Sequence, residues 1–141
     1  MTTKQRAEKS AEVMWNNDKA SVWFGMSIVS VDEGHAVLSL TVNKDHLNGL
    51  DICHGGVTFA LADSAFAFAC NSRNHATVAQ HNNISYLAAA KLGDVLTAEA
   101  KEVSLEGRNG IYDVNVTDQN GKAIAIFRGC SRMVRGRLFE E

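Results

Sequence analysis

Asp63 is the single carboxylate in a long apolar stretch that runs from residue 55 to residue 71. The stretch follows His54 and begins with Gly55 and Gly56, and its other members are mostly Ala, Phe, Val, Leu and Cys. A helix of this composition is apolar on nearly every face, so we expect it to be buried. Burying an unpaired carboxylate costs several kcal/mol unless it is hydrogen-bonded, paired or protonated. Asp63 is therefore expected to be either well satisfied or functional.

The start of this predicted helix offers backbone donors. Gly55 and Gly56 leave their N–H groups unobstructed in the first turn, where they have no intrahelical partner and the peptide dipoles place partial positive charge. An oxygen that develops negative charge fits there, as in an oxyanion hole, although two glycines also permit a tight entry of the chain into the helix. His54 and Gly56 are candidate substrate-binding residues. For the His54 ring, the alternative is a hydrogen bond to backbone that holds the loop.

The spacing of the acid and the glycines sets a geometric condition. Asp63 lies eight residues beyond Gly55, and a rise of about 1.5 Å per residue separates them by roughly 12 Å along the helix. One substrate carbonyl cannot contact both. If both act on one bond, the acid must come from a second, antiparallel copy of the helix, which a two-fold dimer supplies. The alternative is an Asp63 satisfied by Ser64, Thr58 or a hydrogen bond at an interface.

The composition excludes several classes of function. A chain of 141 residues suits a single domain, and 14 basic against 16 acidic residues, with no dense basic block before the tail, disfavour a nucleic-acid partner. The amino terminus is polar and the longest apolar run, Val57 to Cys70, is too short to span a bilayer. Three cysteines without a metal-type spacing suit free thiols in a reducing compartment. We therefore expect a cytoplasmic protein with no membrane partner and no metal site.

The remaining pattern predicts the elements that position these residues. A weak helical period covers about residues 5–16, and the long helix covers about 55–71. Alternating apolar and polar residues predict strands on both sides of the long helix, at residues 26–31, 36–42, 77–87, 95–103, 111–117 and 123–133. Asn120-Gly121 is typical of a hairpin turn, and Glu106 to Gly110 predicts a longer one. The expected fold class is α+β: one domain, 1–141, with an antiparallel sheet of about six strands (ββαββββ) wrapped around a long central helix.

Several motifs together resemble one known family. The motifs are Asn48-Gly49-Leu50-Asp51-Ile52-Cys53-His54-Gly55-Gly56, Leu61-Ala62-Asp63-Ser64-Ala65, Asn83-Ile84-Ser85-Tyr86-Leu87 and Leu92-Gly93-Asp94. They are similar to motifs of the hotdog-fold acyl-CoA thioesterases of the phenylacetate-degradation (PaaI) type, over about Phe24 to Met133. The resemblance implies three catalytic residues. Gly55 would bind the thioester carbonyl through its amide, Asn48 would assist, and Asp63 of the opposite subunit would attack the thioester or activate water.

The chain departs from this family at two places. Many relatives carry a proline beside a basic residue after the third strand, where this chain has Ala88 to Ala90 and then Lys91. Some relatives also carry a Ser or Thr on the third strand that orients the attacking water. Here that role would pass to Gln80 or His81, or be missing.

The resemblance implies an acyl-CoA thioesterase that hydrolyses medium-sized or aromatic acyl thioesters, such as phenylacetyl-CoA. It needs no cofactor, since coenzyme A is part of the substrate. Its expected partners are the substrate and further copies of the chain, because a dimer is needed for the site and a dimer of dimers is expected. Two alternatives stay open: a hotdog module that binds acyl-CoA or an acyl carrier without turnover, and a hotdog enoyl-CoA hydratase that pairs His54 with Asp63.

Overall fold

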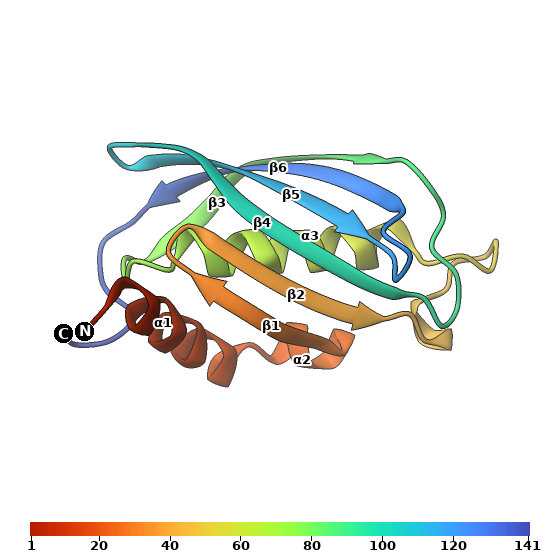
Figure 1. The fold of residues 1–141 in the computed structure, drawn as a ribbon, viewed down its shortest axis with the longest axis horizontal. Helices are drawn as coiled ribbons and strands as arrows, with labels where there is room; N and C mark the ends of the chain where they lie inside the picture. The colour runs from red at the N-terminus through yellow and green to blue at the C-terminus, as the bar shows by residue number, and fades with distance from the viewer.

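The computed structural model describes residues 1–141 and contains three α-helices and six β-strands (Figure 1). Their bounds are α1 Thr3–Asn17, α2 Lys19–Phe24, β1 Met26–Asp32, β2 His35–Thr41, α3 Gly55–Cys70, β3 Thr77–Tyr86, β4 Val95–Glu106, β5 Asn109–Thr117 and β6 Ala123–Met133, with a 3-10 turn at Lys44–His46. The α+β class and the ββαββββ order around the long helix are thus confirmed. No helix of the protein is both long and apolar enough to cross a membrane.

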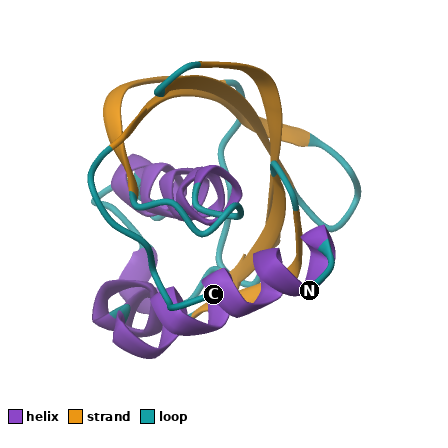
Figure 2. Ribbon diagram, turned by 90° about the vertical axis from the view of Figure 1, so that its left-hand side faces the viewer, coloured by secondary structure: helices purple, strands orange, loops and turns teal.

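All six strands form one antiparallel sheet in the order β1-β2-β4-β5-β6-β3. Seen end-on, the sheet curls around α3, while α1 and α2 lie near its open side (Figure 2). The β4–β5 hairpin is tighter than predicted, because Glu106 pairs directly with Asn109 and leaves only two turn residues. Gly107 of this turn has a φ of +60°, a conformation that glycine adopts without strain.

The core lies between the concave face of the sheet and α3. In β2 the alternation predicted from the sequence holds, since Leu38 and Leu40 are at most 1% exposed while their neighbours are less buried. Phe66 of α3 packs so closely on β6 that a Cβ added to Gly129 would lie 2.7 Å from its ring. Most residues of α3 are thus buried, and Asp63 is among those that stay partly exposed.

The amino-terminal region forms two helices where the sequence predicted one, over about residues 5–16. Asp18 separates them: it ends α1 and caps α2 by accepting a hydrogen bond from Ser21 N–H over 2.9 Å. Gly25, with a φ of +83°, ends α2. Six residues are too few to show a helical period, and Val22 and Trp23 of α2 are exposed, so the pattern carried no signal for this helix.

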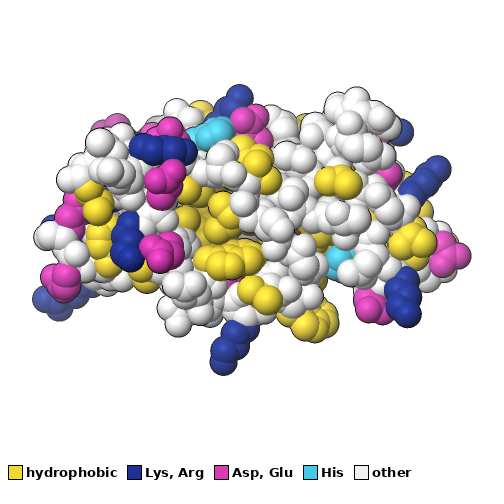
Figure 3. All heavy atoms as spheres, turned by 60° about the horizontal axis from the view of Figure 1, so that its bottom comes forward, with side chains coloured by type: hydrophobic (Ala, Val, Ile, Leu, Met, Phe, Trp, Pro, Cys, Tyr) yellow, Lys and Arg dark blue, Asp and Glu magenta, His cyan; other side chains and the backbone are white.

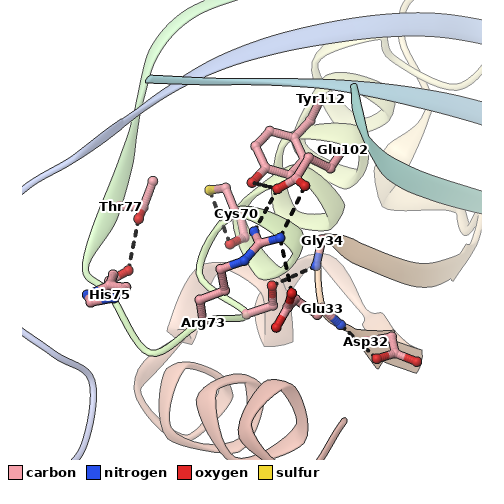
Figure 4. Close-up of polar contacts among 11 residues, drawn as sticks. Asp32, Glu33, Gly34, Cys70, Arg73, His75, Thr77, Glu102 and Tyr112 are labelled. Atoms are coloured by element: carbon pink, nitrogen blue, oxygen red, sulfur yellow. Dashed lines mark hydrogen bonds and ion pairs between the residues drawn. The ribbon is translucent and has the colours of Figure 1, made fainter. Parts of the chain in front are cut away.

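A polar cluster holds the carboxyl end of α3 to the sheet (Figure 4). Arg73 donates two hydrogen bonds to Glu102 of β4, over 2.6 and 3.1 Å, and lies 3.4 Å from Glu33 of the β1–β2 turn. Tyr112 of β5 is 1% exposed and donates from its hydroxyl to Glu102 over 2.9 Å. The Arg73 guanidinium therefore ties the segment after α3 to β4 and to the β1–β2 turn, and Tyr112 links Glu102 to β5.

Candidate active site

Asp63 lies in the middle of α3, is partly buried, and is held by one neutral side chain. Asn82 of β3 donates from Nδ2 to Asp63 Oδ1 over 2.9 Å. Burial raises the pKa of the Asp63 carboxyl above its ordinary value, and the Asn82 hydrogen bond acts in the opposite direction. Asn82 Oδ1 is buried and has no hydrogen-bond partner. The hydrogen bond from Asn82 fixes the orientation of the acid, while the carboxamide oxygen of Asn82 stays buried and unsatisfied.

The helix neighbours considered as partners of Asp63 bond elsewhere. Ser64 Oγ lies 3.1 Å from Ser21 Oγ of α2. Thr58 Oγ1 lies 3.8 Å from Cys53 Sγ. The contact to Asp63 comes instead from the sheet, so the acid is held in place by an element that is distant in sequence.

Asn82, and neither Gln80 nor His81, is the β3 residue that contacts the acid. Gln80 and His81 are both exposed. The pairing of β3 with β6 is irregular between Ala79 and His81, so Gln80 is an extra residue in the ladder. A β-bulge changes which residues of β3 face α3. The strict alternation expected from the sequence does not predict such a bulge. The motif reasoning therefore missed Asn82.

The start of α3 presents one free backbone donor. His54 is the N-cap, and its Nδ1 accepts the Gly56 N–H over 2.8 Å, so the ring holds the loop as the alternative for His54 predicted. The Gly56 donor is occupied by this bond. The Gly55 N–H has no partner in the chain, and the helix dipole adds positive potential there. Gly55 is also packed closely, since Tyr86 donates from its hydroxyl to Gly55 C=O over 2.9 Å.

Asn48 and Gly55 line the same cavity, which has a volume of about 340 Å³. The Asn48 carboxamide oxygen accepts from the backbone of Leu50 over 2.9 Å and of Ile52 over 3.3 Å. These bonds orient the carboxamide and leave its NH₂ group to donate. A backbone N–H and a side-chain NH₂ on one cavity are the donor pair that an oxyanion requires.

Asp63 lines a separate cavity of about 260 Å³. Both Gly55 and Asp63 belong to α3, so the eight-residue spacing holds in the structure and keeps them roughly 12 Å apart. One chain therefore brings Gly55 and Asn48 together but does not bring Asp63 to them. His54 and Asp63 are likewise nine positions apart, so a single chain does not form the His–Asp pair of the hydratase alternative.

The largest cavity, about 400 Å³, lies away from both, beside the Arg73 cluster. Its lining is wholly polar and consists of Arg6, Glu33, Arg73, Asn74, His75, Arg137 and Glu141. Arg6 is paired with Glu141, and Arg73 is paired with the carboxylates described above. Volume therefore does not identify the site, whereas the two smaller cavities hold the free backbone donor of Gly55 and the Asp63 carboxylate.

Comparison with known proteins identifies the family of the chain. A family model described as the thioesterase superfamily matches residues 50–125, which include Gly55, Asp63 and Asn82. The acyl-coenzyme A thioesterase PaaI of Escherichia coli strain K12 is 41% identical over 136 residues, which are 96% of this chain and 97% of that protein.

Solved structures give the same picture. The structure of the E. coli PaaI protein from the phenylacetic acid degradation operon matches with a TM-score of 0.95 and 40% identity, and the match covers 96% of this chain and 99% of that one. A hypothetical thioesterase with coenzyme A from Streptococcus pneumoniae TIGR4 matches with a TM-score of 0.80 and 27% identity, over 89% of this chain and 97% of that one. The chain belongs to the thioesterase superfamily, and the enzyme class expected from its sequence, thioester hydrolase, is confirmed.

Proposed function

We propose that this protein hydrolyses the thioester of an acyl-coenzyme A to the free acid and coenzyme A, and that it prefers medium-sized or aromatic acyl groups of the phenylacetyl type. One observation carries the proposal: α3 bears both an unpaired amide donor, Gly55 N–H, and a partly buried acid, Asp63. The relatives named as acyl-CoA thioesterases and the related structure with coenzyme A support this substrate class.

The proposed site is shared by two chains. β3 is at an edge of the sheet, pairs only with β6, and is exposed along most of its ten residues. A long edge strand with unpaired backbone groups is a template for pairing with another strand. Pairing of two β3 edges about a two-fold axis would place the α3 helices antiparallel, with Gly55 and Asn48 of one protomer facing Asp63 of the other. A dimer of dimers is proposed as the further assembly.

The proposed mechanism follows from these groups. The thioester carbonyl oxygen accepts from Gly55 N–H and Asn48 NH₂, which stabilise the negative charge of the tetrahedral intermediate. Asp63 of the other protomer takes a proton from water while the water oxygen bonds to the carbonyl carbon. The C–S bond then breaks, and the coenzyme A thiolate takes the proton from Asp63.

Asp63 can also attack the carbonyl carbon directly, which gives an anhydride that water then hydrolyses to the same products. In either route the hydrogen bond from Asn82 holds the Asp63 carboxylate in a fixed orientation.

Replacement of the acid tests the proposal. We expect Asp63→Asn to lose at least about 1,000-fold in kcat for phenylacetyl-CoA, because the base or nucleophile is gone. The variant should remain folded and should unfold at no lower temperature at neutral pH, since the buried charge it removes opposes folding. Thiol release measured with a panel of acyl-CoAs checks the activity. Unchanged hydrolysis by a folded Asp63→Asn protein would overturn the assignment.

A further inference from the structure

The cavity that contains Asp63 lies between α3 and the amino-terminal helices. Its lining is Asp18, Ala20, Ser21, Phe24, Met26, Ala60, Asp63, Ser64 and Ala67. Ala60 and Ala67 are three residues before and four residues after the acid, so they flank it on the same helix face. Their small side chains leave space beside the carboxylate, and Phe24 and Met26 add apolar wall from the opposite side.

Asp18 is the second charged residue of this cavity, and its carboxylate is fixed. Oδ1 accepts from Ser21 N–H over 2.9 Å and Oδ2 accepts from the Ser21 hydroxyl over 2.7 Å. The Ser21 hydroxyl is 3.1 Å from Ser64 Oγ and so links α2 to α3 beside Asp63. No lysine, arginine or histidine lines the cavity. It therefore combines apolar wall with fixed negative charge.

The Gly55 cavity has the opposite character. Its lining holds no Asp, Glu, Lys, Arg or His, and one wall is the segment Leu87–Ala90 that follows β3. Ala89 has neither its N–H nor its C=O hydrogen-bonded within the chain. Unpaired backbone groups suit the amides of a pantetheine arm, and the exposed Lys91 that follows suits a phosphate. Coenzyme A therefore fits this side better than the acidic one.

Resting on the proposed function, we infer that the acyl group enters the α2–α3 cavity. Asp18 restricts this cavity to uncharged acyl groups. A carboxylate at the end of the acyl chain would meet the fixed charge of Asp18 without a cation to pair with, and this like-charge contact disfavours it. The α1–α2 region lies outside the residues matched by the superfamily model.

The charge selection is tested with valeryl-CoA and glutaryl-CoA, whose acyl groups differ by a methyl against a carboxylate. The wild type should prefer valeryl-CoA, and Asp18→Asn should raise the glutaryl to valeryl ratio of kcat/KM about tenfold. Asparagine still caps α2. The matched control is Asp118→Asn, which removes the same charge from a carboxylate that accepts backbone N–H groups in the β5–β6 turn. This control should leave the ratio unchanged.

The placement of the acyl group is tested by filling each cavity. Ala67→Leu should lower kcat/KM for phenylacetyl-CoA much more than for acetyl-CoA, whereas Ala89→Leu should lower both alike, since every substrate carries the same pantetheine arm. The comparison of these two cavity-filling variants stays informative even if Asp18→Asn fails to fold. The inference is overturned if Ala89→Leu discriminates between phenylacetyl-CoA and acetyl-CoA while Ala67→Leu lowers both alike. It is also overturned if the glutaryl to valeryl ratio is unchanged in an active Asp18→Asn enzyme. Neither result affects the proposed function. A wild type that releases no thiol from any acyl-CoA overturns the proposed function as well.

Discussion

At the scale of single residues, Asp63 is a carboxylate held by a neutral amide and by no cation. Burial raises the pKa of Asp63 while the Asn82 hydrogen bond opposes that rise. The other titratable groups near it are Asp18, which lines the same cavity, and the Cys70 thiol, whose pKa burial raises to about 12. Asp63 is partly buried without a cation beside it, so it titrates nearer to neutral pH than an ordinary aspartate.

Removing the amide should therefore shift the pH dependence of the reaction. Asp63 must be ionised to act, so activity is lost as the pH falls through its raised pKa. Asn82→Leu removes the bond that lowers this pKa, and the acidic limb of kcat/KM should move to higher pH with a drop in kcat. The matched control is Asn115→Leu, since Asn115 is exposed on the interior strand β5 and does not bond to Asp63. An acidic limb that does not move in Asn82→Leu would contradict the positioning role.

The residues differ in how far the sequence revealed them. An acid inside an apolar helix behind His54-Gly55-Gly56 is visible from residue types and spacing alone. The occupation of the Gly56 donor by the His54 ring depends on a rotamer, and the contact of Asn82 depends on a bulge. Neither detail can be read from the periodicity of the sequence. The sequence therefore pointed to Asp63 as the candidate acid but did not reveal Asn82, which holds it.

At the scale of elements, α3 carries the reactive groups and its two ends are fixed by different means. The His54 cap holds its start. The Arg73, Glu102 and Tyr112 cluster holds the segment after its end (Figure 4). The side chains of Arg73 and Glu102 are 26% and 24% exposed, whereas those of the Arg128–Asp113 pair on the sheet surface are 54% and 44% exposed. The two ion pairs therefore differ in burial and in the further contacts of the first pair with Glu33 and Tyr112.

This difference gives a stability prediction. Arg73→Met should lower the free energy of unfolding by about 1–3 kcal/mol, because Glu102 loses its charged partner in a partly buried place. Arg128→Met, the matched control, should cost less than about 1 kcal/mol. Urea unfolding measures the loss in free energy of unfolding for both variants. Equal losses would contradict the larger contribution expected of the Arg73 pair.

The same pair gives a pH test. Arg73 holds the pKa of the Glu102 carboxyl below its ordinary value, so the stability it contributes is present at neutral pH and is lost as the pH falls through the lowered pKa. The difference between wild type and Arg73→Met in urea should therefore shrink in acid. A difference that does not change with pH would indicate that Arg73 acts through packing alone.

The sequence predicted most elements closely because alternation and turn residues are local signals. It predicted β6 with its observed bounds and the long helix to within one residue. It missed α2, whose six residues show no period, and it ended β4 early because glycine suggested a longer turn. Close contacts such as Gly129 on Phe66 bring together residues far apart in the chain, and only the folded structure reveals them.

At the scale of the whole molecule, one chain carries two separate parts of a site. Gly55 and Asn48 line one cavity and Asp63 lines another. The face that carries the helices has hydrophobic side chains gathered toward its middle and charged ones mostly around its edge (Figure 3). Together with the free edge of β3, this arrangement suits the proposed dimer. The spacing of Gly55 and Asp63 in the sequence requires a second chain if both act on one bond.

The donor half of the site can be removed with little change to the backbone. Gly55 is the first residue of α3, where proline is tolerated, and His54 has the extended conformation that a residue before proline prefers. Gly55→Pro therefore removes the N–H and should lower kcat by about 100- to 1,000-fold. Gly55→Ala places a Cβ against the same exposed Tyr86 ring but keeps the N–H. Its kcat should fall much less, and equal losses would assign the effect to packing.

Mixing of two inactive variants tests the shared site most directly. Asp63→Asn and Gly55→Pro chains are unfolded together in equal amounts, refolded, and assayed for thiol release from phenylacetyl-CoA. About half of the dimers should be mixed, and each mixed dimer has one intact site, so the mixture should recover about a quarter of the wild-type activity. Activity no higher than that of the two variants refolded separately would show that Asp63 and Gly55 of different chains do not form one site.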